Sequence, residues 1–424
     1  MANYSTLSKQ ELASLQKELE EKYNSFKARN LSLNMARGKP GADQLDLSME
    51  LLNSVNDKTG YKAEDGTDCR NYGILDGIPE CKKLFAEILG VDEKNVIIGG
   101  NSSLNLMFDY IAQCMTNGCG DTPWAKLDKI KFLCPAPGYD RHFGILDYFG
   151  IEMLTVPMLD NGPDLKVVDE LIKDSSVKGM FCVPKYSNPE GKTYSDEVVE
   201  HLASMKPAAK DFRIIWDNAY CVHHINDNHD KLLNIFDVCE KYGTQDRIFE
   251  VVSTSKITFP GAGVSALAAS DNNIQMIKKR MNMQTIGADK LNQLRHAKYL
   301  KDANGVDEYM KKHAEILAPK FKAVLDAFDK EFSDLGIAKW TKPNGGYFIS
   351  LDVMDGCAKE VVRLCKEAGV ALTPAGATFP YGKDPHDKNI RIAPSFPPVA
   401  ELELAVELLC ICVKLASVNK LLEA

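Results

Sequence analysis

The chain has 424 residues, enough for roughly two or three domains and a large hydrophobic core. Hydrophobic residues make up 45% and charged residues 26%, which is ordinary for a globular protein in water. With 51 basic and 59 acidic residues the formal net charge is −8, and lysine and arginine form no run or stripe. Nucleic acids and acidic membrane surfaces are therefore poor candidates as partners.

The twelve cysteines are scattered among apolar stretches and form no C-x-x-C pair. Thiols in this pattern are typical of buried, reduced residues in a cytosolic protein, and we expect no metal site. The first residues lack the cationic region and the apolar core of a signal peptide, and no apolar run reaches membrane-spanning length. We therefore expect a cytoplasmic protein without a membrane segment.

The N-terminal segment predicts an amphipathic helix. Ser8-Lys9-Gln10-Glu11 has the pattern of a capping box, in which serine and glutamate side chains satisfy free N–H groups at a helix start. The apolar residues that follow share one helical face: Leu12, Leu15, Leu19, Tyr23 and Phe26.

Short apolar runs then alternate with helical patterns such as Asp196–Met205. The runs that we interpret as strands are Val96–Ile98, Lys131–Cys134, Ile151–Val156, Gly179–Val183, Arg213–Trp216, Ile248–Val252 and Val264–Ala269. This alternation predicts an α/β fold, with a mainly parallel sheet and helices on both faces.

Beyond about residue 315 the pattern changes to α+β. A long helix (Ala314–Phe332) precedes an apolar strand at Gly346–Leu351, a helix near Cys357–Ala368, two short strands and a final helix from Glu401. We expect an N-terminal segment (1–60) that contributes to a small domain, a large α/β domain (61–315) and a small C-terminal α+β domain (316–424).

Four polar segments come just after predicted strands: Gly99–Ser103, Asn188, Asp217 and Lys256. In open α/β sheets, ligands bind at the rim formed by the carboxyl ends of the strands. We therefore expect these segments to meet at one site, although they lie far apart in the sequence.

A glycine turn at Gly99–Ser103 leads into a predicted helix. Free N–H groups and the helix dipole make such a turn suitable for a phosphate, and nearby serine hydroxyls can add donors. The residues that would hold the phosphate are Gly100, Ser102, Ser103, Ser253 and Ser255. A well-capped loop without a ligand is the alternative.

Lys256 stands among small hydroxyl residues at the end of a predicted strand. It can carry a carbonyl cofactor covalently, or it can be a solvated loop lysine. Asp217 ends another apolar strand, where an ionised carboxylate needs a partner. A protonated pyridine nitrogen, a helix N-terminus or a structural ion pair would each serve. A lysine, a buried acid and a phosphate turn are together what pyridoxal phosphate (PLP) chemistry requires.

Further residues of the rim suit the same chemistry. Tyr220 and Asn188 can hydrogen-bond the phenolic oxygen of PLP, and Tyr139 offers a flat face to its ring. Lys256, once released by substrate, would move a proton between substrate and cofactor. Arg391 lies in an apolar strand-like segment, where its fork fits a substrate α-carboxylate or, alternatively, a structural salt bridge.

The chain resembles fold-type I PLP enzymes of the class I aminotransferase group, and more closely the aspartate aminotransferase branch whose members are often labelled MocR-type. The resemblance covers nearly the whole chain. The segments that carry it are Asn34–Pro40, Arg70–Gly73, Pro137–Phe143, Val183–Pro189, Trp216–Tyr220 and Gln284–Gly287.

The resemblance implies a role for each matching residue. It makes Lys256 the PLP lysine of the large domain, Asp217 the partner of the pyridinium nitrogen and Tyr139 the stacking ring. Tyr72 matches a tyrosine that reaches the phosphate of the neighbouring subunit, which implies a homodimer with shared active sites. The other matches are Asn188 and Tyr220 at the phenolic oxygen, Arg391 and Asn188 at the α-carboxylate, and Gly100, Ser102, Ser103, Ser253 and Ser255 at the phosphate.

One segment departs from the pattern of this group. Its members usually carry an arginine shortly after the PLP lysine, in a Gly-x-Arg pattern that neutralises the phosphate. Here the stretch Pro260–Val264 contains no arginine. The phosphate must therefore draw more on serines, backbone N–H groups or another cation.

A substrate with a second carboxylate needs a second cation in the pocket. The candidates are Arg37, Lys39, Arg141 and Arg295, and each can instead be a structural or surface residue. We favour Arg37 and Arg141, because both lie in segments expected near the cofactor. The resemblance favours L-aspartate as amino donor and 2-oxoglutarate as acceptor.

We therefore expect a cytosolic PLP aminotransferase that moves an amino group from L-aspartate, or a related amino acid, to a 2-oxo acid in a ping-pong cycle. A PLP-dependent β-lyase or decarboxylase is the alternative within PLP chemistry, because the bond that breaks depends on how the substrate is oriented. A MocR-like regulatory effector would require a helix-turn-helix module, and only about thirty residues precede Asn34.

Overall fold

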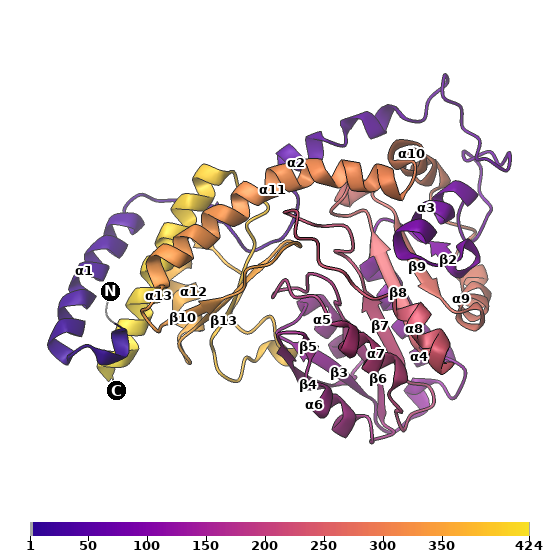
Figure 1. Cartoon of the computed structure of the whole chain (residues 1–424). Helices are drawn as coiled ribbons and strands as arrows, with labels where there is room; N and C mark the ends of the chain where they lie inside the picture. The colour runs from indigo at the N-terminus through magenta and orange to yellow at the C-terminus, as the bar shows by residue number, and fades with distance from the viewer. Residues whose placement is uncertain (1–2, 424) are drawn as a thin grey trace.

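The computed structural model describes residues 3–423, which form two connected parts (Figure 1). The larger part is built on an eight-stranded sheet in the order β2-β9-β8-β7-β6-β3-β4-β5. Its strands are β2 (Val96–Ile98), β3 (Lys131–Ala136), β4 (Glu152–Leu159), β5 (Gly162–Pro163), β6 (Val177–Cys182), β7 (Arg213–Asp217), β8 (Ile248–Ser253) and β9 (Ser265–Ala269). The neighbours from β4 through β3, β6 and β7 to β8 pair in parallel, whereas β5 and β9 are antiparallel to their neighbours. The prediction of a mainly parallel sheet is confirmed.

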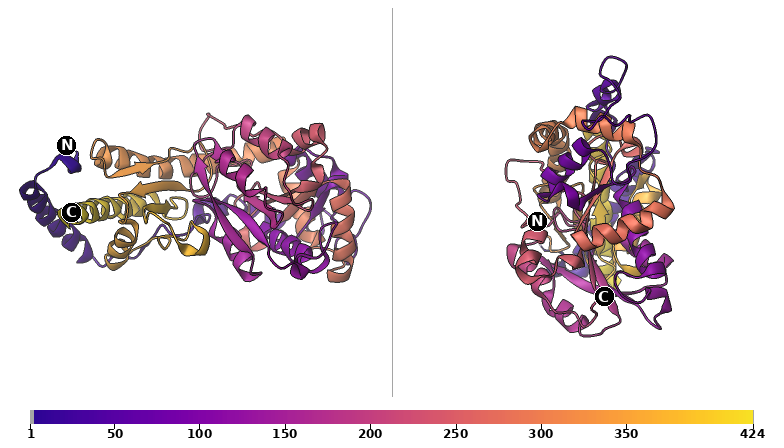
Figure 2. Two further views of the ribbon diagram at one scale, coloured as in Figure 1. Left: turned by 90° about the horizontal axis from the view of Figure 1, so that it is seen from below. Right: turned by 90° about the vertical axis from the view of Figure 1, so that its right-hand side faces the viewer.

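Helices cover both faces of this sheet (Figure 2). Every residue of β7, β8 and β9 is buried, as expected for continuous apolar strands between two helical layers. The helices of this part are α3 (Pro79–Leu89), α4 (Ser103–Asn117), α5 (Asp140–Tyr148), α6 (Leu165–Leu171), α7 (Asp196–Ser204), α8 (Ile235–Tyr242), α9 (Asp271–Gln284) and α10 (Lys290–Leu300).

The central strands bring distant parts of the sequence to one edge. β6, β7 and β8 are parallel neighbours, with Cys182 opposite Trp216 and Asp217 opposite Val251. Their carboxyl ends therefore lie side by side, and the segments that follow them share one rim.

The smaller part is α+β, as predicted. Its three-stranded antiparallel sheet has the order β10-β11-β13, and a short parallel pair joins β1 to β12. Its elements are α1 (Lys9–Lys27), β1 (Leu33–Asn34), β10 (Ala338–Trp340), β11 (Ile349–Val353), α12 (Ala358–Glu367), β12 (Val370–Ala371), β13 (Asn389–Ile392) and α13 (Val399–Glu423). The capping box of α1 is present, because Ser8 and Glu11 each accept a hydrogen bond from the other's backbone N–H.

One hydrophobic cluster joins α1 to the C-terminal helices. Leu12, Leu19, Tyr23 and Phe26 of α1 are buried in the same cluster as residues of α12 and α13. The N-terminal helix thus packs on the C-terminal segment, and both ends of the chain lie at the same end of the molecule (Figure 1). The domain limits near residues 60 and 315 stay a prediction.

Helix α11 (Ala303–Phe332) runs along both parts (Figure 1). The predicted start at Ala314 is wrong, because the side chain of Asp302 caps the helix by accepting from the N–H of Gly305 over 2.8 Å. The N-terminal half buries Val306 and Met310 in a cluster of the larger part, and the C-terminal half buries Phe321 and other residues in the cluster of the smaller part.

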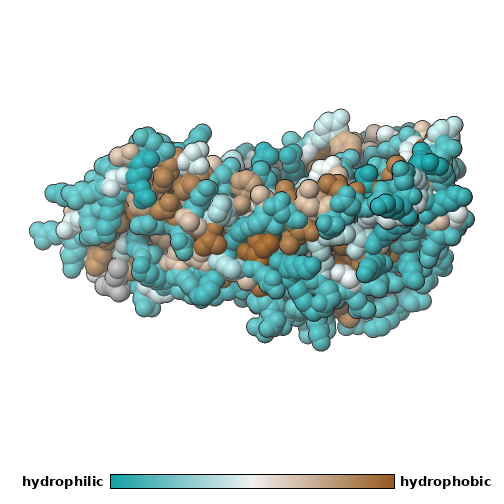
Figure 3. Space-filling model, turned by 90° about the horizontal axis from the view of Figure 1, so that it is seen from above, coloured by the Kyte–Doolittle hydropathy of each residue, from teal (hydrophilic) through white to brown (hydrophobic). Residues whose placement is uncertain are grey.

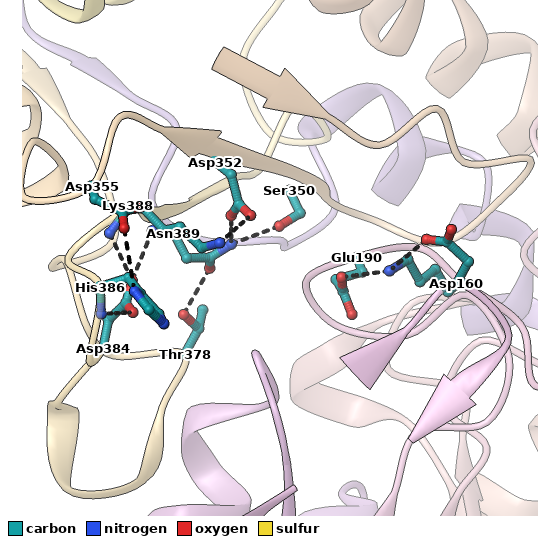
Figure 4. A network of polar contacts seen from close by, with 11 residues as sticks. Asp160, Glu190, Ser350, Asp352, Asp355, Thr378, Asp384, His386, Lys388 and Asn389 are labelled. Carbon is teal, nitrogen blue, oxygen red and sulfur yellow. Dashed lines mark hydrogen bonds and ion pairs between the residues drawn. The ribbon is translucent and has the colours of Figure 1, made fainter. Parts of the chain in front are cut away.

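A polar network fixes the segment that leads into β13 (Figure 4). The amide of Asn389 donates to the hydroxyl of Ser350 and to the carboxylate of Asp352, both over 2.8 Å, and accepts from Thr378 over 2.8 Å. The carboxylate of Asp384 accepts from the backbone N–H of Asn389 over 2.8 Å. These bonds hold β13, and therefore Arg391, in place.

The surface and the cysteines have the character that the sequence composition predicts for a globular protein in water. Seen from above, hydrophobic side chains gather near the middle of a mostly hydrophilic face (Figure 3). All twelve cysteines are free, and all except Cys221 are buried, as predicted. Among residues 3–423, no helix combines the length and the apolar character needed to cross a membrane.

Candidate active site

Lys256 follows β8 and points toward two tyrosine rings. Its Nζ lies 5.0 Å from the ring centre of Tyr220 and 5.9 Å from that of Tyr347. Burial lowers the pKa of the Lys256 ammonium, and the negative charge of Asp217 partly opposes that shift. More of this amine is therefore neutral, and able to act as nucleophile or base, than in a lysine exposed to water.

Asp217 ends β7 and is 3% exposed. Its Oδ2 lies 2.9 Å from Nε2 of His142, a buried histidine on α5. Its Oδ1 is also buried, and it has no hydrogen-bond partner among the described residues. A buried acceptor without a donor is costly, and a pyridinium N–H of PLP would satisfy it. The residues at this point fit the cofactor.

Sequence reasoning missed His142, which lies three residues after Tyr139. Its ring stacks on Phe181, with 4.3 Å between the ring centres, and meets Tyr139 edge-on at 5.0 Å. This packing fixes the histidine beside Asp217. A histidine one helical turn beyond the predicted stacking ring was the available signal.

The three residues assigned to the cofactor ring lie on the same rim. Tyr220 is 3% and Asn188 is 3% exposed, and Tyr139 is partly buried. Burial raises the pKa of the Tyr220 hydroxyl, and it raises the pKa of Tyr139 to about 12. Both hydroxyls therefore keep their protons at neutral pH, so Tyr220 is available as a hydrogen-bond donor.

The predicted phosphate residues come together from two segments. Ser255 donates to the carbonyl of Asn101 over 3.2 Å, and Ser253 donates to Ser255 over 3.0 Å. These bonds place both serines beside Gly100 and the start of α4. Ser102 caps that helix by accepting from the N–H of Leu104 over 3.2 Å, and Ser103 is its first residue. An anion at this helix start would meet free N–H groups and hydroxyls.

A neutral amide supports the loop in which the family's arginine is missing. Asn292 donates to two carbonyls of the stretch Pro260–Val264, over 2.9 and 2.8 Å. The backbone N–H of Val264 donates to Thr254 over 2.9 Å. No cation takes the arginine's place within this stretch of the described chain.

Arg391 lies on β13 and reaches the rim from the smaller part. Its Nη1 donates to Oδ1 of Asp140 over 2.9 Å and to Oδ1 of Asn188 over 3.2 Å, and its guanidinium lies 5.0 Å from the ring centre of Phe348. The structure thus shows the alternative for Arg391, a salt bridge, with Asp140, which the sequence analysis did not single out. Its role toward a substrate α-carboxylate stays a prediction.

The four cations proposed for a second carboxylate lie in different surroundings. Arg37 and Arg141 are exposed, and neither has an ion-pair partner within residues 3–423. Arg141 follows Asp140 on α5, and against the larger effect of burial the charges of Arg141 and Arg391 both act on the hydroxyl of Tyr139 by lowering its pKa. Lys39 stacks on Phe396, with its Nζ 4.0 Å from the ring centre, and Nε of Arg295 is buried without a partner in the part of the chain described.

Tyr72 does not enter the site of its own chain. It is 82% exposed, and Met283 and Ile286 are 86% and 62% exposed. These two residues precede Gly287, which lies against the backbone of Gly73 and Ile74 next to Tyr72. Lys290 donates to the carbonyl of Gly73 over 2.7 Å, which ties the tyrosine loop to α10. Its role toward a second subunit stays a prediction.

Comparisons with known proteins agree with this geometry. The family model described as aspartate amino-transferase matches residues 7–424. An aspartate aminotransferase of Corynebacterium glutamicum is 47% identical over 402 residues, which cover 94% of this chain and 93% of the relative. The crystal structure of an aspartate transaminase from C. glutamicum has a TM-score of 0.96 at 45% identity and covers 99% of both chains.

A more distant structure shares the fold. LysN, the α-aminoadipate aminotransferase of Thermus thermophilus, was solved with N-(5'-phosphopyridoxyl)-L-leucine; its TM-score is 0.73 at 22% identity, with 93% of this chain and 95% of its own covered. The chain has the fold of the type I PLP-dependent transferases, and it is an aminotransferase that belongs to the aspartate aminotransferase family.

Proposed function

We propose that this aminotransferase binds PLP on Lys256 and moves an amino group from L-aspartate, or a related amino acid, to 2-oxoglutarate in a ping-pong cycle. The observation that carries the proposal is Asp217, a buried carboxylate with one oxygen held by His142 and the other without a partner among the described residues. When bound there, PLP withdraws electrons from the substrate Cα.

Asp217 would hold the pyridinium N–H through its free oxygen. His142 keeps the carboxylate in one orientation, since its bond to Oδ2 is 2.9 Å long and both side chains are buried. Tyr220 and Asn188 would hydrogen-bond the phenolic oxygen, and Tyr139 would cover one face of the ring.

Lys256 would carry the cofactor and later move the proton at the substrate Cα. Burial lowers the pKa of its ammonium, so removing the proton to give the neutral amine costs less free energy at neutral pH. Gly100, Ser102, Ser103, Ser253 and Ser255 would hold the phosphate through N–H groups and hydroxyls.

Arg391 would bind the substrate α-carboxylate, with Asn188 beside it. Arg37 and Arg141 would serve the distal carboxylate of L-aspartate or 2-oxoglutarate, because both are exposed cations without ion-pair partners in residues 3–423. Exposed guanidinium groups keep their charge and can reach an incoming dianion.

We also propose a cytoplasmic homodimer in which Tyr72 reaches the phosphate of the other subunit. Support comes from the exposure of Tyr72 and Met283, 82% and 86%, because large apolar side chains rarely stand so free on a surface without a partner. Reduced, buried cysteines support the cytoplasmic assignment.

The test is a visible spectrum of the purified protein, first with L-aspartate and then with 2-oxoglutarate. We expect the band of the bound cofactor to disappear with the amino acid and to return with the 2-oxo acid. A band that persists with L-aspartate but bleaches with alanine would overturn the donor alone. Bleaching that 2-oxoglutarate cannot reverse would favour lyase chemistry, and a protein that takes up no PLP would exclude the role of Lys256.

A further inference from the structure

An ion pair between Arg391 and Asp140 joins the two parts of the molecule. Arg391 belongs to β13 of the three-stranded sheet, and Asp140 is the first residue of α5 beside the eight-stranded sheet. The bond from Nη1 to Oδ1 is 2.9 Å long, and the exposed fractions of the two side chains are 8% and 36%. The arginine is thus interior, whereas the carboxylate stands at the border with solvent.

The hydrogen bonds of Arg391 determine where another carboxylate can bind. Nη1 donates to Asp140 and to Asn188, which accounts for both of its N–H bonds. Nε donates to Thr373 over 3.4 Å, while Nη2 has no partner among the described residues. A carboxylate that binds the end of the fork needs one N–H from each terminal nitrogen, so it must displace a partner of Nη1.

Of the two partners, only Asn188 can remain beside an added carboxylate. Its amide can turn and present Nδ2, which is a donor, to the incoming oxygen. Ionised Asp140 has acceptors only, and two carboxylates on one nitrogen repel each other. A carboxylate that binds the end of the fork therefore displaces the aspartate.

We propose that Asp140 is an internal carboxylate that competes with the substrate α-carboxylate for Arg391. The proposal rests on the role of Arg391 given above. The competitor keeps a buried guanidinium paired, since an unpaired buried charge is costly, and it lowers the affinity for every ligand that binds through this arginine. Its displacement also removes an ion pair between the two parts of the molecule.

The test uses Asp140→Asn, which keeps the shape of the side chain and removes its charge. Calorimetry on the PLP-loaded protein measures the affinity for two unreactive probes, succinate and propionate. Both probes should bind about two- to fivefold more tightly to the variant, the range expected for a partly exposed ion pair. The KM for 2-oxoglutarate should fall by a similar factor, with little change in kcat.

Three variants serve as controls. Asp196→Asn removes the same charge from the first residue of another helix, α7, and should leave probe binding unchanged. Asp140→Glu retains a competing carboxylate and should stay close to the unmodified protein. Arg391→Gln should abolish the difference between the Asp140 variants, because the competition takes place at this arginine.

The outcomes separate this inference from the proposed function. Weaker binding of both probes to Asp140→Asn would mean that the aspartate orients Arg391. Tighter binding of succinate alone would mean that the aspartate repels a distal carboxylate. Either result overturns the proposal that Asp140 competes for Arg391. If Arg391→Gln lowers probe affinity but Asp140→Asn does not raise it, the inference fails and the proposed function stands. Probe binding that is indifferent to Arg391 overturns the inference and the role of Arg391 at the α-carboxylate, while the visible spectrum still tests the amino transfer itself.

Discussion

Only one carboxylate oxygen of Asp217 has a hydrogen-bond partner within residues 3–423. Oδ2 lies beside His142, whereas Oδ1 has no donor. A carboxylate in that position is useful when a charged donor approaches the second oxygen. The functional argument at the residue scale therefore rests on the unpartnered Oδ1 of Asp217.

Asp217→Asn should lower the turnover of L-aspartate about ten- to hundredfold, because a hydrogen bond between charged groups is worth about 1.5–3 kcal/mol. Stopped-flow bleaching of the visible band measures this rate. Glu250→Gln is the matched control, since Glu250 is a buried carboxyl on the adjacent strand that faces Asn218 instead. Equal rates in Asp217→Asn and the unmodified protein would contradict the assignment.

Glu250 also gives a prediction about pH. Burial raises its pKa to about 8 from 4.5, although the amide of Asn218 donates to it over 2.8 Å. Between these two values the unfolded chain loses the proton before the folded protein does, so the native state loses stability as the pH rises. The Gln variant cannot ionise, and its lead in stability over the unmodified protein should grow from pH 5 to pH 8 and then level off.

Urea unfolding of both proteins at a series of pH values checks this expectation. A second variant, Glu197→Gln, controls for charge, because Glu197 is exposed in the first turn of α7. A constant difference between Glu250→Gln and the unmodified protein across the series would show that the glutamate is ionised in the native state throughout.

The elements that carry the site were mostly predictable from the sequence. Buried central strands such as Arg213–Asp217 contain an unbroken apolar run, here Ile214–Trp216, so their positions follow from the local sequence pattern. The rim residues at their ends follow from the rule for open α/β sheets. Asp140 and His142 were missed because both gain their partners only when α5 folds against distant strands, although the position of His142 one turn beyond Tyr139 was an available signal.

Element boundaries were less predictable. The first turn of α11 contains Asn304 and Gly305, which have low helix propensity, so the apolar pattern became visible only further along. The cap at Asp302 was the missed signal. Segments held by tertiary bonds, such as the loop before β13, have no sequence period at all and could not be predicted.

The polar network around Asn389, the first residue of β13, should matter for substrate affinity. Asn389→Ala removes the amide oxygen that accepts from Thr378 and the amide N–H groups that donate to Ser350 and Asp352. Leaving such buried partners unpaired costs about 1–3 kcal/mol of unfolding free energy, and looser anchoring of Arg391 should raise KM more than it lowers kcat.

Chemical unfolding and steady-state kinetics measure the two effects. Asn226→Ala is a suitable control, because Asn226 is exposed and its side chain bonds outside the site. It donates to Asn344 over 3.1 Å and accepts from the N–H of Asn228 over 2.8 Å. A stability loss without any change in KM would mean that the polar network supports the fold but does not position Arg391.

At the scale of the whole molecule, the shared active site can be tested by mixing subunits. If Tyr72 acts across the dimer, each site takes Lys256 from one chain and Tyr72 from the other, so in a mixed dimer Tyr72→Ala and Lys256→Ala fall in the same site. A mixed dimer then has one intact site, and an equal mixture should recover about a quarter of the unmodified activity. Activity that stays at the level of the separate variants would place Tyr72 outside the neighbouring site.

The MocR-type branch, unlike the family, stays a prediction.

Helix α11 has a consequence for how the protein unfolds. It is 30 residues long, roughly 45 Å, and it is buried in the hydrophobic clusters of both parts. If either part unfolds, one half of this helix loses its hydrophobic contacts. Independent unfolding of the two parts is therefore unfavourable. We expect near-ultraviolet and far-ultraviolet circular dichroism to report one coincident transition in urea, so that the chain, although built on two sheets, behaves thermodynamically as a single cooperative unit.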